Sequence, residues 1–247
     1  NHSCAIVDGG VQCWGWGEVL GHGDPPSNES TPVDVLDISN ATDIAAGYDF
    51  TCAIDAGAAK CWGDNSSGQI GVEGLLLYFH KPQPVTGLGS GVTAISVGQA
   101  SACAIVSGGA MCWGDNTQGQ LGNGTYDSGY VPLPVIGLER GVLAIFMGGA
   151  HTCALTTQGP RCWGSNQFGE LGAGISAMNS PIPVPVVVLP ERILSFALNS
   201  YYTCAVVENG GVCWGQNSTG QLGNGGIPWL PLPQAVTEGP IFANGFE

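Results

Sequence analysis

The sequence predicts an all-β fold, a five-bladed β-propeller in which each blade is a repeat of about 50 residues. Ten cysteines form five pairs with one spacing, C-x8-C, and Trp-Gly follows each pair at once. The first cysteines of successive pairs lie 48, 51, 50 and 51 residues apart, a period typical of propeller blades or solenoid turns. The 41 glycines, 16 prolines and 44% hydrophobic residues are typical of short buried strands joined by tight turns. The pairs are Cys4 with Cys13, Cys52 with Cys61, Cys103 with Cys112, Cys153 with Cys162, and Cys204 with Cys213.

The repeats leave no room for a second domain, so we expect a single propeller domain over residues 1–247. The first unit lacks its first strand, and residues 240–247, which follow the fifth unit, resemble that strand. We therefore expect residues 240–247 to complete the first blade. Pairing within one chain would close a ring, which effective concentration favours, whereas pairing between chains would build a head-to-tail polymer. The five units lie near residues 1–40, 41–91, 92–141, 142–191 and 192–239.

Each cysteine pair belongs to a β-hairpin whose register follows from counting. If Cys52 pairs with Cys61 in the second unit, Ala56-Gly57 is left as a two-residue turn. In the first unit the same count leaves Asp8-Gly9, a strong signal for a type I′ turn. The two cysteines then face each other on antiparallel strands with Cα atoms about 4.5–5.5 Å apart, which a disulfide spans. We therefore expect one disulfide within each blade.

The strands of the second unit illustrate the other elements. We expect strands over residues 43–47, 50–54 and 59–63, because short apolar runs are bounded there by glycine or aspartate. Proline removes a ladder donor, so the stretches 181–185 and 231–233 are expected to terminate strands.

A second motif, W-G-x-N-x-x-G-[QE]-[LI]-G, spans residues 62–71, 113–122, 163–172 and 214–223. Its glycines can take a positive φ, its Asn can bond to its own turn, and its Leu or Ile can fill the space between units. Phosphate binding is not expected, because no strand-to-helix context and no Lys accompany these glycines. The first unit departs from the motif, since residues 14–21 lack the Asn turn.

A family resemblance lies in the sequence of residues 149–155, in Cys-Trp-Gly-Ser-Asn at 162–166, and in Gly-Gln-Leu-Gly-Asn-Gly at 220–225. These repeats resemble those of the regulator of chromosome condensation family, and the likeness recurs along essentially the whole chain. The resemblance implies a β-propeller with four-stranded blades. Nuclear members use a basic surface for chromatin and one face for a small GTPase, whereas this chain is acidic and rich in cysteine. Nucleotide exchange is therefore not expected.

Charge and cysteine content limit the compartment and the partners. Only 5 Lys and Arg stand against 19 Asp and Glu, a net charge of −14, which would repel nucleic acid and anionic membranes. No run approaches the roughly 20 apolar residues of a membrane helix. Paired cysteines indicate an oxidising compartment, so we expect a processed extracellular protein, secreted or at the cell surface. We expect no cofactor and no metal, because C-x2-C spacing is missing and the four histidines do not recur with the cysteines.

The variable loop after each turn motif is unusually apolar and aromatic. Equivalent loops of successive blades lie on one rim, so these residues predict a protein contact surface. Alternatively, they fold back over the blade edges as local core. Together with two residues of the terminal segment, the candidate interface residues are Trp16, Leu75, Leu76, Leu77, Tyr78, Phe79, Tyr126, Tyr130, Ile227, Trp229, Phe242 and Phe246.

Asn-x-Ser/Thr sequons are candidate glycosylation sites. For two of them, Asn65 and Asn217, a hydrogen bond within the repeat turn is the alternative role. The sequons begin at Asn1, Asn28, Asn40, Asn65, Asn123 and Asn217.

No Ser-His-Asp set and no pair of carboxylates recurs, so we assign no catalytic residues and do not expect an enzyme. The preferred interpretation is a secreted, non-enzymatic structural or interaction propeller that assembles with itself into an oligomer or filament. One alternative is a binding module for another extracellular protein or a glycan, inhibitor-like or lectin-like, which exposed aromatic residues on one face would favour. Another is a hydrolase or lyase with a site on the rim.

Overall fold

The computed structural model describes residues 1–23, 26–74, 76–187, 192–226 and 228–236. Its strands form five antiparallel sheets in chain order, which we call blades 1 to 5; blade 1 has three strands and each of the others has four. A short 3₁₀ helix, η1 (Gly17–Val19), follows the second strand of blade 1. The five-bladed, all-β propeller expected from the sequence is confirmed.

Within each blade the strands lie side by side in sequence order, with the first strand nearest the centre of the propeller and the last at its outer edge. Blade 1 contains β1 (His2–Val7), β2 (Gly10–Gly15) and β3 (Glu29–Asp34), and blade 2 contains β4 (Ala41–Ala46), β5 (Phe50–Asp55), β6 (Ala58–Asp64) and β7 (Tyr78–Pro84). Blade 3 contains β8 (Val92–Val97), β9 (Ser101–Val106), β10 (Gly109–Gly114) and β11 (Gly129–Pro134), and blade 4 contains β12 (Val142–Met147), β13 (His151–Thr156), β14 (Arg161–Ser165) and β15 (Asn179–Pro185). Blade 5 contains β16 (Ile193–Leu198), β17 (Tyr202–Val207), β18 (Gly210–Gly215) and β19 (Leu230–Ala235).

The central hairpin of each blade has the register that counting gives. Cys52 lies opposite Cys61, and the turn residues Ala56 and Gly57 have φ of 50° and 80°, as a type I′ turn requires. Blade 4 differs in its turn, because Pro160 stands in its hairpin and β14 begins only at Arg161.

All ten cysteines form disulfides, and each disulfide joins the two middle strands of one blade. The paired cysteines face each other across the hairpin as expected, and their Cα–Cα distance of 4.1 Å in every pair is slightly shorter than the expected separation. The expected disulfide within each blade is confirmed. The bonds join Cys4 to Cys13, Cys52 to Cys61, Cys103 to Cys112, Cys153 to Cys162, and Cys204 to Cys213.

The expectation that proline-rich stretches terminate strands holds only for Pro185, the last residue of β15, and is otherwise wrong. Residues 181–185 lie inside β15, and residues 231–233 lie inside β19. Both are the outermost strands of their blades, so one edge of each strand needs no donor to a neighbour. The register shift next to the Trp-Gly step, as between Cys162 and Gly164, accommodates the remaining prolines of these strands.

Adjacent blades are joined by a repeated tryptophan contact. Trp113 of blade 3 packs with Cys61, Ile70 and Val85 of blade 2, and its indole nitrogen donates to the carbonyl oxygen of Gln69 at 2.9 Å. Trp163 and Trp214 repeat this contact with blades 3 and 4. The tryptophan of each blade therefore fills the side of the blade before it.

The Asn turn prepares the surface that receives each tryptophan. In blade 2 the Asn65 side-chain oxygen accepts from the Ile70 amide at 3.1 Å, and its side-chain nitrogen donates to the Leu76 carbonyl oxygen. This turn places the buried Ile70 under Trp113. Blade 1 lacks the turn and has η1 there instead, and the buried indole nitrogen of Trp62 has no hydrogen-bond partner among the described residues.

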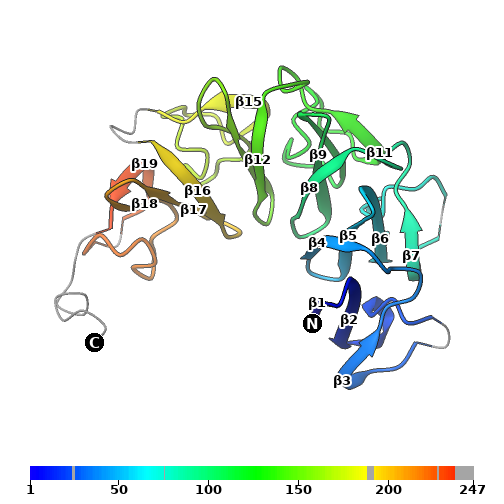
Figure 1. The fold of residues 1–247 in the computed structure, drawn as a ribbon. Helices are drawn as coiled ribbons and strands as arrows, with labels where there is room; N and C mark the ends of the chain where they lie inside the picture. The colour runs from blue at the N-terminus through cyan, green and yellow to red at the C-terminus, as the bar shows by residue number, and fades with distance from the viewer. Residues whose placement is uncertain (24–25, 75, 188–191, 227, 237–247) are drawn as a thin grey trace.

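The five blades follow an arc, with the first and the last blade at its two ends (Figure 1). Close approach of the innermost turns sets the curvature, since a Cβ on Gly98 would lie 2.5 Å from the carbonyl oxygen of Gly148. Among the described residues, β1 pairs only with β2 and has no inner neighbour. The prediction that residues 240–247 complete blade 1 falls outside the described residues and stays a prediction.

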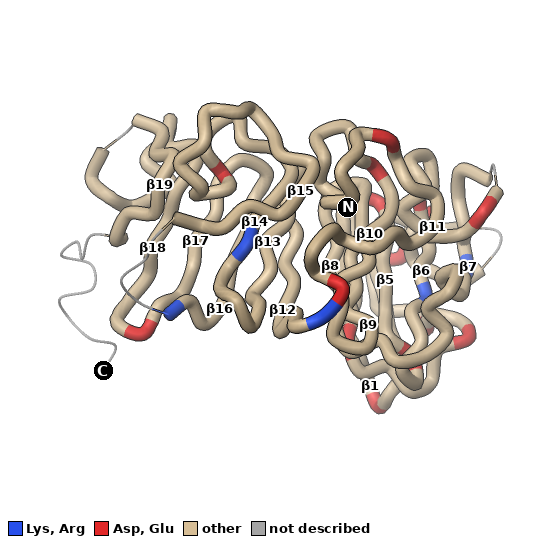
Figure 2. The backbone as a smooth tube through the Cα atoms, turned by 90° about the horizontal axis from the view of Figure 1, so that it is seen from above, with Lys and Arg blue, Asp and Glu red and all other residues tan. Residues whose placement is uncertain are grey.

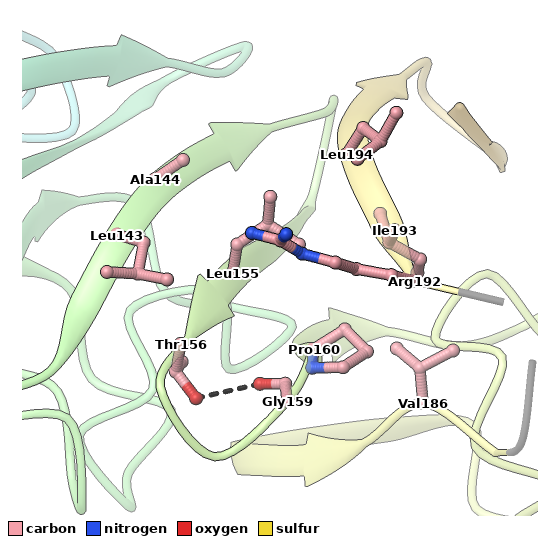
Figure 3. A pocket seen from close by; sticks show the side chains of 10 residues that line it. All are labelled: Leu143, Ala144, Leu155, Thr156, Gly159, Pro160, Val186, Arg192, Ile193 and Leu194. Carbon is pink, nitrogen blue, oxygen red and sulfur yellow. Dashed lines mark hydrogen bonds between the residues drawn. The ribbon is translucent and has the colours of Figure 1, made fainter. Parts of the chain in front are cut away.

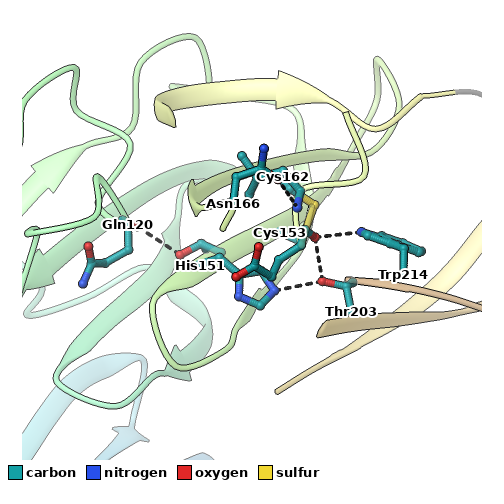
Figure 4. The surroundings of a disulfide bond; sticks show 10 residues. Gln120, His151, Cys153, Cys162, Asn166, Thr203 and Trp214 are labelled. Atoms are coloured by element: carbon teal, nitrogen blue, oxygen red, sulfur yellow. Dashed lines mark hydrogen bonds between the residues drawn. A yellow bond between two sulfur atoms is a disulfide. The ribbon is translucent and has the colours of Figure 1, made fainter. Parts of the chain in front are cut away.

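A buried histidine adds a polar link between blades 4 and 5 (Figure 4). His151 Nε2 lies 2.8 Å from the Thr203 hydroxyl oxygen, and that hydroxyl donates to the Glu170 carbonyl oxygen at 2.9 Å. Because the hydroxyl has one hydrogen, already donated, Nε2 must carry the imidazole proton. Burial lowers the pKa of His151 to about 3.

The lowered pKa predicts a pH-dependent stability. Between about pH 6.5 and about pH 3 the unfolded chain binds a proton at His151 that the folded chain does not, so stability falls by about 1.4 kcal/mol per pH unit on acidification. In the double variant His151→Phe/Thr203→Ala, both new residues are those found at the equivalent positions between blades 2 and 3, where Phe50 and Ala102 belong to one apolar cluster. It should fold and lose this part of the slope in urea titrations at several pH values. An unchanged slope would contradict the assignment.

Candidate functional site

The loops of the propeller divide between two opposite faces. One face, which we call the loop face, holds the turns between the first and second strands and the long loops between the third and fourth strands of blades 2 to 5, together with the loop between β2 and β3 of blade 1. The other, the hairpin face, holds the central hairpin turns and the connections from one blade to the next. Those candidate interface residues that the structure describes belong to the loop face because they lie in the long loops or at the strand ends beside them.

Exposed aromatic side chains are confined to the loop face among the described residues. Exposed aliphatic side chains, by contrast, occur on both faces, as Leu76 on the loop face and Leu143 at the hairpin end of β12 illustrate. Aromatic enrichment is a mark of protein interfaces. The exposed aromatic residues are Tyr48, Tyr78, Tyr126, Tyr130, Tyr201 and Trp229.

The sequence-based candidates divide into exposed, packed and undescribed residues. Leu76 and Leu77 are 64% and 60% exposed. Trp16 is only partly exposed and meets the Tyr78 ring edge-on with centroids 6.2 Å apart, and Phe79 packs against the core of blades 2 and 3. Packing as local core therefore occurs in these loops, and a contact surface made by their exposed residues stays a prediction. Leu75, Ile227, Phe242 and Phe246 lie outside the described residues.

The long loops also link neighbouring blades. The Tyr126 hydroxyl donates to the Asn179 side-chain oxygen at 2.9 Å, which joins the rims of blades 3 and 4. Between blades 4 and 5, Met178 and Trp229 line a hollow of about 330 Å³. These contacts make the rim a continuous surface across blade boundaries.

A second hollow lies at the centre of the loop face, where the inner turns of blades 2 to 5 converge. It measures about 440 Å³ and is lined by Tyr48, Gln99 and Tyr201 together with glycine backbone. Tyr48 and Tyr201 are 58% and 47% exposed. Sequence analysis missed both tyrosines, although each lies in the inner turn that leads into the second strand of its blade.

The hairpin face holds a groove between blades 4 and 5 (Figure 3). It measures about 730 Å³, and Leu143, Leu155 and Ile193 form its apolar walls. Arg192 extends across it and makes no ion pair with any described residue. Pro160 contributes to this opening, because it lacks the amide with which Ala110, its counterpart in blade 3, bonds to the Leu138 carbonyl oxygen.

The buried carboxyl group of Glu170 has a structural role. It accepts hydrogen bonds from the Ser165 hydroxyl at 3.2 Å and the Phe168 amide at 2.8 Å, and burial raises its pKa. In blade 2 the equivalent Gln69 instead donates to Asp64. Blade 4 thus has Glu170 where blade 2 has Gln69, and Ser165 where blade 2 has Asp64, so each pair keeps one donor and one acceptor.

Among the described residues, no group of three His, Cys, Asp or Glu is arranged to hold a metal ion.

The sequons differ in access. Asn65 and Asn217 are 2% and 0% exposed, and both amides are bonded within the repeat turn, which is the alternative role weighed for them. Glycosylation of these two residues stays a prediction. Asn1, Asn28 and Asn40 are exposed, whereas Asn123 is partly buried. Glycosylation at these four positions stays a prediction.

No helix in the described part of the chain has the length and hydropathy that crossing a membrane requires.

Comparisons with known proteins agree with the repeat and the fold. The model of the regulator of chromosome condensation (RCC1) repeat matches residues 8–54 and 107–155, and a second model of that repeat matches residues 41–69. The ultraviolet-B receptor UVR8 of Arabidopsis thaliana is 32% identical over 140 residues, which cover 53% of this chain and 32% of the receptor. The human E3 ubiquitin-protein ligase HERC2 is 34% identical over 128 residues, or 49% of this chain and 3% of the ligase.

Solved structures support the same architecture. Prp20p of Saccharomyces cerevisiae superposes with a TM-score of 0.81 at 23% identity, over 96% of this chain and 61% of Prp20p. Human WBSCR16 superposes with a TM-score of 0.79 at 21% identity, over 96% of this chain and 65% of that protein. The chain thus spans less than two thirds of these relatives. Its repeats and its blades make it an RCC1-like β-propeller.

Proposed function

We propose that the chain is a non-enzymatic protein-interaction propeller that docks its partner on the loop face. One observation carries this proposal: every exposed aromatic side chain of the described residues lies on that face. Tyrosine and tryptophan supply large contact areas at a low cost in side-chain entropy. The likeness to Prp20p supports a protein as the partner, since Prp20p binds Gsp1p and histones.

We further propose that this interaction takes place outside reducing compartments. Five disulfides, with no free cysteine, are typical of secreted or cell-surface proteins. Eight of the ten cysteines are buried, all except Cys4 and Cys204. The disulfides therefore belong to the core of each blade.

Self-assembly is a second candidate function, favoured by the inner edge of β1. Ile6 and Val7 are exposed, and in blades 2 to 5 an inner strand covers the equivalent edge. An unpaired strand edge is a template for strand addition. In this candidate, residues 240–247 of the same or a second copy add to β1. Light scattering after size-exclusion chromatography tests it: large oligomers support pairing between copies, and a homogeneous monomer at high concentration rejects it.

The docking proposal is tested by comparing variants as baits in affinity capture from native extracellular fluid. Tyr126→Ser/Trp229→Ser removes two rim aromatics, and Leu36→Ser/Leu143→Ser removes two exposed side chains from the hairpin face as a matched control. We expect the native bait and the control to retain the same partner and the rim variant to lose at least about 10-fold of it, as for interface hot spots. Equal retention by both variants would reject the loop face.

A further inference from the structure

Resting on the proposed function, we infer that the partner presents a Lys- and Arg-rich protein segment to the loop face, over blades 1 to 3. Two independent features of this part of the face carry the inference. One is the sign of its charge, and the other is an aromatic pair embedded in that charge.

The charge of the loop face is of one sign. None of its described loops contains Lys or Arg, and the few cations of the chain stand elsewhere (Figure 2). Lys60 and Arg161 lie at the hairpin end of β6 and β14, Arg140 and Arg192 lie in the hairpin-face connections before β12 and β16, and Lys81 lies within β7. Loop-face carboxylates of blades 1 to 3 include those of Glu18, Asp49, Asp64, Glu73, Asp115 and Asp127.

The acidic half and the neutral half of the face differ in what they can bind. In blades 4 and 5 the loop-face turns and long loops carry one carboxyl group, that of Glu170, which is buried and bonded within its turn. Their exposed side chains are uncharged and include the large hydrophobic Met178 and Trp229, which line a hollow. A partner that covers the whole face therefore meets negative charge at one end only, which fixes its orientation.

Trp16 and Tyr78 form the aromatic pair at the junction of blades 1 and 2. Their rings meet edge-on at an interplanar angle of 86°, so the Tyr78 side chain, which is 39% exposed, remains accessible beside Trp16. Burial and the nearby carboxylates of Asp64, Asp49 and Glu18 raise the pKa of Tyr78, a sign of negative potential at the ring. A guanidinium or ammonium group is attracted by both aromatic faces and carboxylates.

Net charge alone would attract a cation to any part of the molecule, so the test must separate the two faces. The loop-face variant Asp49→Asn/Glu73→Gln/Asp127→Asn and the hairpin-face variant Asp8→Asn/Asp37→Asn/Glu208→Gln each remove three negative charges. Asn tolerates the positive φ of Asp8 and Asp37, so the control retains its turns. The two variants have equal net charge, and only the position of the lost charge differs.

The probe is a fluorescent peptide of about ten arginines, with an oligoglutamate of equal length as the negative control. We expect the native chain to bind the arginine peptide and to lose about 10-fold or more of its affinity when NaCl rises from about 50 mM to about 300 mM. The loop-face variant should bind at least about 10-fold more weakly than the hairpin-face variant at low salt. Equal affinities of the two variants, or no binding by the native chain, would overturn the inference.

The two proposals fail in different ways. If the native partner is lost by the rim variant Tyr126→Ser/Trp229→Ser but is held equally by both charge variants at all salt concentrations, the docking face stands and the basic segment is rejected. If the partner is held by the rim variant as well, the docking face itself is rejected. Loss of the partner from the rim variant and from the loop-face charge variant, but not from the hairpin-face variant, supports both proposals.

Discussion

Complete reduction of the five disulfides should unfold the chain at a temperature and pH at which the oxidised chain stays folded. Each disulfide closes a short loop, with cysteines 9 residues apart, and chain entropy gives it about 2–3 kcal/mol. Five such contributions are comparable to the whole stability of a protein of this size, about 5–15 kcal/mol. The measurement is circular dichroism and tryptophan fluorescence after reduction in denaturant and transfer to native buffer.

The control is the same cycle of denaturation and transfer without reductant, which should restore the native spectrum. A chain that regains its native spectrum with all ten thiols alkylated would contradict the expectation. It would show that the blade cores hold the fold without the disulfides, and the argument for an oxidising compartment would then lose its energetic basis.

Replacement of Trp163 by alanine should cost about 4 kcal/mol of unfolding free energy. The ring is fully buried between blades 3 and 4, and its loss leaves a cavity and removes a 2.8 Å hydrogen bond to the Gln120 carbonyl oxygen. Thr152 still donates to that oxygen at 3.0 Å, so the carbonyl keeps a partner. Guanidinium unfolding with the disulfides intact measures the loss.

Trp14 provides the matched control, because it holds the same motif position in blade 1 but is only partly buried. Trp14→Ala should cost less than half as much as Trp163→Ala. Equal losses would mean that the tryptophans stabilise their own hairpins, and the description of each tryptophan as a contact with the preceding blade would then be wrong.

Local features of the fold follow from the sequence where spacing alone determines geometry. Eight residues between two cysteines leave one hairpin register and one turn, so Cys52, Cys61 and the Ala56-Gly57 turn are found where counting places them. The Asn turn is equally local, since Asn65 bonds only to residues within its own loop.

Features that depend on neighbouring blades are harder to predict. The prolines of β15 are tolerated because that strand is outermost, and strand order is not encoded in the stretch itself. The bond between His151 and Thr203 joins residues 52 positions apart, and their separate positions in two repeats give no sign of it. Tyr48 and Tyr201 converge only because the arc brings the inner turns of four blades together.

The apolar loops show where sequence pattern reaches its limit. Leu77, Tyr78 and Phe79 are consecutive and equally apolar, yet Leu77 is exposed and Phe79 packs against the core of blades 2 and 3. The strand begins at Tyr78, and from there side chains alternate between the two sides of the blade. Composition identifies the rim, and only the strand boundary decides which residues face solvent.

Site-specific photo-cross-linking tests the docking face most directly. A photoreactive phenylalanine analogue replaces Tyr126 on the loop face in one sample and Leu36 on the hairpin face in another, and both are irradiated in native extracellular fluid. We expect a discrete adduct from position 126 and none from position 36, and the mass of the adduct separates a second copy of the chain from another protein. An adduct from position 36 alone would contradict docking on the loop face.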